Sequence, residues 1–151
     1  MKKLLFTLAT VCGLGLPAFA ADLNWLTDFA KAKAQAKAEG KLVMLDFTGS
    51  DFCPPCIRLA KEVFPTKEFS EYAKKHLVLV EVDFPAKKKQ SPELKAANQA
   101  LAKEFKVDGY PTLLIITPDG KNLGEVEFDL ADGKAKEVIA AIEKLAQKAK
   151  P

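Results

Sequence analysis

The sequence predicts an α/β fold in which a central mixed β-sheet is flanked by helices on both faces. Short apolar runs rich in β-branched residues, typical of buried strands, alternate with longer segments whose apolar residues recur at helical spacing. Strands separated by a helix are expected to be parallel, because a parallel crossover needs a long connection. A Pro-Asp-Gly turn near the C-terminus joins two further strands, which predicts an antiparallel hairpin.

The first predicted helix covers about residues 26–39. Its apolar residues at helical spacing are Trp25, Phe29, Ala32 and Ala36. Gly40 follows as a stop signal. The run KLVMLDF, residues 41–47, is short, apolar and followed by turn residues, so it predicts a buried strand.

A second helix is predicted to begin at the pair Cys53 and Cys56, to be interrupted at Pro65 and to resume over residues 66–76. The run LVLVEVDF, residues 77–84, predicts a second buried strand. A polar loop then leads into a third helix that ends near residue 106. A serine and a proline, in that order, mark its start as cap and first helical residue.

The C-terminal part is predicted to form the hairpin and a last helix. Strands over residues 110–117 and 123–130 flank the turn at 118–121. The segment 133–150 predicts an amphipathic helix, because its apolar residues fall on one face. Without an internal repeat or a linker, residues 21–151 are predicted to form a single domain.

The first 20 residues, MKKLLFTLATVCGLGLPAFA, have the three parts of a secretory signal peptide. A basic start is followed by an apolar stretch from Leu4 to Leu16 and by a small-x-small cleavage site, so cleavage is predicted after Ala20. Lipidation of Cys12 is disfavoured by the bulky residue before it. We therefore expect secretion across the inner membrane, a periplasmic location and no membrane span in the mature chain.

The charge of the chain excludes one function class. Removing Lys2 and Lys3 from 23 Lys+Arg leaves 21 against 20 Asp+Glu, so the mature chain is almost neutral. The remaining lysines are spread over several predicted helices and form no basic stripe interleaved with aromatic residues. Nucleic acid is therefore not an expected partner.

The motif Cys53-Pro-Pro-Cys56 admits several chemical interpretations. A zinc site needs four ligands, but the mature chain offers two thiolates and one distant histidine, His76. Haem attachment would need a histidine where Ile57 stands. A purely structural disulfide would close a loop too short to stabilise the fold much. Ligand count alone leaves a two-coordinate Cu(I) site open.

Redox exchange explains best why the pair stands at the start of a helix. Unpaired N–H groups and the positive end of the helix dipole stabilise the thiolate of the first cysteine. The thiolate is the species that attacks in disulfide exchange. The second cysteine, one turn inside, can then resolve the mixed disulfide. Redox activity at Cys53 and Cys56 is the favoured interpretation.

Several motifs in order resemble the thioredoxin-like superfamily: the strand LVMLDF before C-x-x-C, the segment VDGYPTLLII, the PDG turn and the last helix. Within it the chain is most similar to secreted thioredoxin-fold proteins and to the C-terminal periplasmic domain of the thiol:disulfide interchange reductase. The resemblance covers about residue 22 to the end. It implies the thioredoxin fold, thiol:disulfide oxidoreductase activity and no metal or organic cofactor beyond the redox-active disulfide itself.

The resemblance also implies roles for individual residues. Cys53 would be the exposed nucleophile, Cys56 the buried resolving thiol and Pro111 a cis-proline facing the pair. Asp46 would relay a proton to or from the resolving cysteine, and burial should raise its pKa. The residues expected to contact a substrate chain are Tyr110, Phe52, Pro54 and Pro55.

Three departures from the family pattern concern these roles. The stretch from Asp46 to Cys53 is one residue longer than in thioredoxin, and Phe52 replaces a common tryptophan. The lysine that often partners the buried aspartate has no evident counterpart. Glu81 and Asp83 lie nearby in the second strand and are interpreted as solvated strand-end residues.

The two prolines bear on the direction of electron flow. Pro54 and Pro55 lack the N–H groups that could stabilise a Cys53 thiolate, and Asp51 adds a negative charge nearby. A less stabilised thiolate favours the oxidised form, so we expect a reductase or isomerase. Its partners would be protein thiols and disulfides and an upstream membrane thiol reductant. The alternative is a non-catalytic binding protein, including one that carries Cu(I) on the two thiolates.

Overall fold

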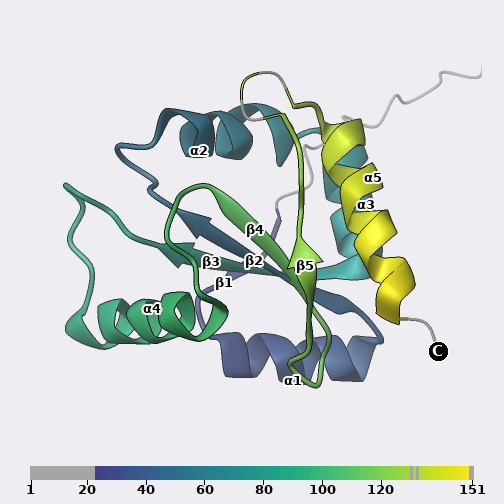
Figure 1. Cartoon of the computed structure of the whole chain (residues 1–151), viewed down its shortest axis with the longest axis horizontal. Coiled ribbons are helices and arrows are strands. Elements are labelled where there is room, and N and C mark those ends of the chain that lie inside the picture. Colours follow the sequence, from purple (N-terminus) through teal and green to yellow (C-terminus); the bar gives the residue numbers. More distant parts are fainter. Residues whose placement is uncertain (1–22, 130, 132, 150–151) are drawn as a thin grey trace, which may run out of the picture.

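The computed structural model describes residues 23–129, 131 and 133–149. The predicted signal peptide, residues 1–20, lies outside the described residues. Five strands form one mixed sheet in the order β1-β3-β2-β4-β5 (Figure 1). The strands are β1 (Trp25–Leu26), β2 (Leu42–Thr48), β3 (Leu77–Asp83), β4 (Thr112–Ile116) and β5 (Asn122–Glu125).

Strand directions agree with the predicted fold class. β2 and β3, which are separated by helices, pair in parallel, and β1 joins β3 in parallel. β4 runs antiparallel to β2 and forms the hairpin with β5. The prediction of a mixed sheet with a C-terminal hairpin is therefore confirmed.

Helices cover both faces of the sheet, as predicted (Figure 1). They are α1 (Phe29–Glu39), α2 (Pro54–Arg58), the π-helical turn η1 (Leu59–Val63), α3 (Lys67–His76), α4 (Pro92–Phe105), α5 (Ala135–Ala146) and the 3-10 turn η2 (Gln147–Ala149). Because strand side chains alternate, Val43 and Leu45 pack toward α1 and α4. Met44 faces the other core, with α3 and α5.

The N-terminal end of the first helix differs from the prediction. The segment Trp25–Leu26 forms strand β1, and the helix begins only after Asp28, whose side chain accepts the backbone N–H of Lys31 at 3.0 Å. The indole of Trp25 lies 5.1 Å from the ring of Phe64, in the core opposite to the one that α1 covers. Its helical spacing from the later residues was coincidental, because pairing with β3 decides its conformation.

The last strand is shorter than predicted. β5 ends at Glu125, whereas the sequence suggested a strand to residue 130, which itself lies outside the described residues. The ladder is irregular beside Ile115 and Ile116, and Gly124 has φ 137°. A Cβ on Gly124 would lie 2.9 Å from Leu145 Cδ2, so glycine permits the close approach of α5.

Local capping chemistry accounts for the other helix boundaries. Ser91 caps α4 through its hydroxyl, which accepts the N–H of Leu94 at 3.2 Å, and Pro92 occupies the first turn. The cysteine helix continues through η1 and breaks at Pro65, after which Thr66 caps α3. These boundaries confirm the prediction and fix where the cysteine pair lies relative to the sheet.

Candidate active site

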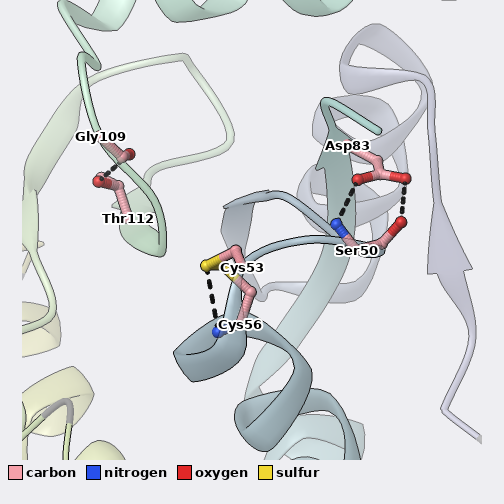
Figure 2. Close-up of a disulfide and its surroundings, with 6 residues drawn as sticks. All are labelled: Ser50, Cys53, Cys56, Asp83, Gly109 and Thr112. Carbon is pink, nitrogen blue, oxygen red and sulfur yellow. Dashed lines mark hydrogen bonds between the residues drawn. A yellow bond between two sulfur atoms is a disulfide. The ribbon is translucent and has the colours of Figure 1, made fainter. Parts of the chain in front are cut away.

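The cysteine pair lies where β2 leads into α2. The backbone N–H of Cys53 donates to the carbonyl of Gly49 at 3.0 Å, and the N–H of Ile57 donates to the carbonyl of Cys53 at 3.0 Å. Cys53 is thus held in extended conformation as the N-cap of α2. Its sulfur is bonded to that of Cys56, with 5.3 Å between the two Cα atoms (Figure 2).

Both cysteines are buried in this oxidised form. Cys53 is 6% exposed and Cys56 is 3% exposed. The expectation of an exposed Cys53 is therefore wrong for the disulfide state. The physical reason is the cap geometry, since the Cys53 sulfur is turned over the first turn of α2 and accepts the Cys56 N–H at 3.4 Å.

A turn that precedes β4 lies beside the disulfide (Figure 2). Its Tyr110–Pro111 peptide bond is cis, and Pro111 is buried. The hydroxyl of Thr112 donates to the carbonyl of Gly109 at 3.0 Å, which closes the turn. The fold therefore brings Pro111 to the same end of the sheet as the cysteines.

Three aromatic rings lie around this turn. The Tyr110 ring stacks on Phe84 at a centroid distance of 5.1 Å and meets the edge of Phe52 at 6.4 Å. Phe52 is 48% exposed. A Cβ on Gly49 would lie 2.6 Å from the Phe52 ring, so only glycine leaves room for the ring in this position.

Asp46 lies in the middle of β2 and faces a cavity of about 270 Å³. Cys56 lines the same cavity, together with Trp25 and Thr48, so the longer stretch between Asp46 and the cysteines does not separate them. The side chain of Asp46 is buried, and its Oδ1 has no hydrogen-bond partner. Burial, with smaller contributions from Glu81 and Asp83, raises the pKa of Asp46 to about 8.

Glu81 and Asp83 are more than the solvated strand-end residues that the sequence predicted, because both are partly buried. Asp83 accepts hydrogen bonds from the backbone N–H of Ser50 at 2.9 Å and from its hydroxyl at 2.6 Å (Figure 2). Glu81 is half-buried and lines the Asp46 cavity. Burial first, and then the charge of Asp83, raise the pKa of Glu81. The signal was available in the sequence, since these two are acidic residues in an otherwise apolar strand.

The charge of Asp51 is bound by a neighbouring loop. Its carboxylate accepts the backbone N–H groups of Ala86, Lys87 and Lys88, each at 2.8 Å. These hydrogen bonds hold the pKa of Asp51 below its usual range. The three N–H dipoles partly offset the negative charge, which weakens the predicted influence of Asp51 on the Cys53 sulfur.

Within the described parts of the chain, no group of three or more His, Cys, Asp or Glu side chains is close enough to hold a metal ion. His76 ends α3 with its ring 4.7 Å from that of Tyr72, and it does not line the cavity beside the cysteines.

Across the same described residues, no helix has the length and apolar character to span a membrane.

Comparison with known proteins decides the family. The family model for the thioredoxin-like domain matches residues 29–142. The chain belongs to the thioredoxin-like family. Within it, disulfide bond reductase DsbH of Chlamydia pneumoniae is 40% identical over 119 residues, which cover 79% of this chain and 71% of that protein. The predicted resemblance is confirmed.

Other thioredoxin-like relatives agree. A solved structure of a DsbH oxidoreductase covers 92% of this chain and 94% of its own, with 34% identity and a TM-score of 0.78. The thiol:disulfide interchange protein DsbD of Pseudoalteromonas atlantica is 31% identical over 98 residues, which are 65% of this chain and only 15% of that protein. Together with the Cys53–Cys56 disulfide, these relatives identify the chain as a thioredoxin-like thiol:disulfide oxidoreductase.

The thioredoxin-like fold brings most of the expected site residues together. Pro54 and Pro55 form the first turn of α2 beside the disulfide, and Phe52 meets Tyr110 across the gap to the turn before β4. Asp46 lies behind the pair, in the cavity with Cys56. Residues from β2, from α2 and from the turn before β4 thus meet at one end of the sheet.

Proposed function

We propose that this thioredoxin-like protein is an exported reductase or isomerase that acts on disulfides of protein clients. The observation that carries the proposal is the 40% identity, over 79% of the chain, to a protein named a disulfide bond reductase. The redox group is the Cys53–Cys56 disulfide, without a metal or organic cofactor. Its partners are client proteins and an upstream thiol reductant in the membrane. The name of one relative, a thiol:disulfide interchange protein, supports an exchange of thiols and disulfides with other proteins.

The proposed reduction takes place in two exchanges. The Cys53 thiolate attacks one sulfur of a client disulfide, and the other client sulfur leaves as a thiolate. Asp46 takes the proton of the Cys56 thiol, and the resulting thiolate attacks the Cys53 sulfur. The Cys53–Cys56 bond forms, the mixed disulfide breaks, and the client leaves with both of its cysteines reduced. Backbone at Tyr110 and Pro111 binds the client chain meanwhile.

The equilibrium potential of the pair against glutathione tests the direction. We expect a value more negative than roughly −200 mV, because Pro54 and Pro55 have no N–H to donate to the Cys53 sulfur, which leaves it the N–H of Cys56. A value near roughly −120 mV, typical of strong oxidants, would contradict the reductase assignment.

Pro55→Ala is expected to make the potential less negative by about 30–60 mV. The substitution restores an N–H at the second helical position, from which a cap side chain commonly accepts a hydrogen bond. Such a bond to a thiolate contributes about 1.5–3 kcal/mol and stabilises the reduced form. Pro54→Ala is the matched control, because its N–H at the first position points less well to the cap. Equal shifts in both variants would refute this explanation.

Phe52→Ala is expected to raise KM for a reducible protein client about tenfold, because a bound chain would cover the exposed ring. Reduction of glutathione disulfide serves as the control substrate, since it is too small to cover the ring and reach the sulfurs together. Steady-state kinetics with both substrates make the measurement. If both reactions slow by the same factor, Phe52 does not bind the client.

The periplasm is the proposed location. The signal-like segment ends at Ala20, and a disulfide pair is compatible with a compartment in which disulfides persist. The intact mass of the protein recovered from a periplasmic extract tests this proposal, since we expect the mature chain to begin at Ala21. A full-length mass in the cytoplasmic fraction would contradict it.

A further inference from the structure

Glu81 lies between two cavities. One is the cavity of about 270 Å³ that also contains Asp46 and Cys56. The other, of about 290 Å³, is lined by Asp83, Lys88 and Asn98 in addition to Glu81. Glu81 is thus an acid that lines both the cavity beside the disulfide and the cavity at the loop after β3.

The two carboxyl groups of the inner cavity are neighbours on the sheet. Asp46 and Glu81 are register partners on the parallel strands β2 and β3, so their side chains leave the same face. Like charges directly opposite on a sheet are destabilising, and two carboxyls that share a site cannot both ionise easily. One of the pair therefore retains a proton at neutral pH.

The surrounding elements contribute few compensating charges. Asp83 on β3 adds negative charge, and Lys88 on the following loop adds positive charge beside Glu81. The residue of β4 in register with Asp46 is the uncharged Leu113. From α2 the titratable group that faces the pair is Cys56, whose sulfur changes protonation during turnover.

The outer cavity has polar groups suited to water. Asn98 is 1% exposed, its Nδ2 donates to the carbonyl of Asp83 at 2.9 Å, and its Oδ1 has no partner among the described residues. A cavity with several convergent polar atoms holds water readily. Asn98 and Glu81 supply such atoms. Lys88, which also lines the cavity, is exposed on the loop after β3.

We propose that Glu81 relays protons between the Asp46 carboxyl and solvent, through the outer cavity beside Asn98 and Lys88. The relay completes the exchange that the cysteine pair carries out. It rests on thiol:disulfide exchange by this pair but does not depend on the net direction of electron flow.

Reduction of the protein by a dithiol begins with one thiol exchange and one proton transfer. A thiolate of the reductant bonds to the Cys53 sulfur, and the Cys53–Cys56 bond breaks with its electron pair on the Cys56 sulfur. This thiolate takes the proton of the Asp46 carboxyl. The Asp46 carboxylate then regains a proton from water by way of Glu81. In the reverse reaction the proton leaves by the same path.

The test is the pH dependence of single-turnover reduction by dithiothreitol, followed through the fluorescence of Trp25, which lines the inner cavity with Cys56. For Glu81→Gln we expect a rate about tenfold lower at pH 7. We also expect the midpoint of the plot of rate against pH to move down by about one pH unit, because the negative charge of Glu81 beside Asp46 is gone. Glu81→Asp should restore much of the wild-type profile. Glu104→Gln, which removes an exposed carboxylate on α4, should leave it unchanged.

The outcomes separate this inference from the assigned chemistry. If dithiothreitol fails to reduce the wild-type disulfide, the proposal that this cysteine pair exchanges disulfides is refuted. If wild type is reduced but the Glu81→Gln profile superimposes on it, only the relay is refuted. Carbon-13 titration of the wild-type carboxyls gives a test without any variant. Coupled, two-step curves for Asp46 and Glu81 support the relay, and independent single-step curves overturn it.

Discussion

Cys53→Ser is expected to reduce the disulfide reductase activity to the uncatalysed background, whereas Cys56→Ser is expected to accumulate clients as mixed disulfides. Serine at residue 53 cannot attack a disulfide, because its hydroxyl is not ionised at neutral pH. Serine at residue 56 leaves the attacking thiolate in place but removes the thiol that would release the client. Insulin reduction measures the first effect, and non-reducing electrophoresis with mass spectrometry measures the second.

Each variant must be shown to fold. The disulfide joins residues only three apart in sequence, so its loss should lower the unfolding free energy by only about 2 kcal/mol. Wild-type protein reduced with dithiothreitol is the matched control, since it lacks the disulfide and keeps both thiols. Stoichiometric Cu(I) binding by a wild-type protein that reduces no disulfide would instead support the binding-protein alternative.

Asp46→Asn is expected to stabilise the fold, and the gain should grow as pH rises. Burial raises the pKa of Asp46 from 3.8 to about 8, so the folded protein retains a proton that the unfolded chain loses above about pH 4. Wild-type stability therefore declines as pH rises between these two values and levels off above the upper one. Asparagine fills the same volume without a charge and removes this decline.

The expected gain is on the order of 5 kcal/mol at pH 8 and near zero at pH 4, measured by urea unfolding at both pH values. The same variant should exchange disulfides more slowly, because Cys56 loses its proton acceptor. Asp108→Asn is the matched control, since it removes an exposed aspartate outside the cavity. A stability difference that does not change with pH would show that folding does not raise the pKa of Asp46.

The sequence by itself determined the features that depend on neighbouring residues. Ser91 with Pro92 marks the start of α4 through one local hydrogen bond and one tolerated missing donor. The Pro-Asp-Gly turn makes the hairpin for a similarly local reason. The position of Cys53 at the start of α2 also follows from residues within one turn of it.

Only the tertiary structure decided the features that depend on strand pairing and packing. Strand β1 exists because β3 offers an edge to Trp25, a partner more than 50 residues away that helical spacing could not reveal. The register between β2 and β3 places Glu81 beside Asp46, although the sequence shows each acid only within its own apolar strand. Pairing of this kind is set by contacts between distant segments, and side chains share a cavity or raise one another's pKa only after those contacts form.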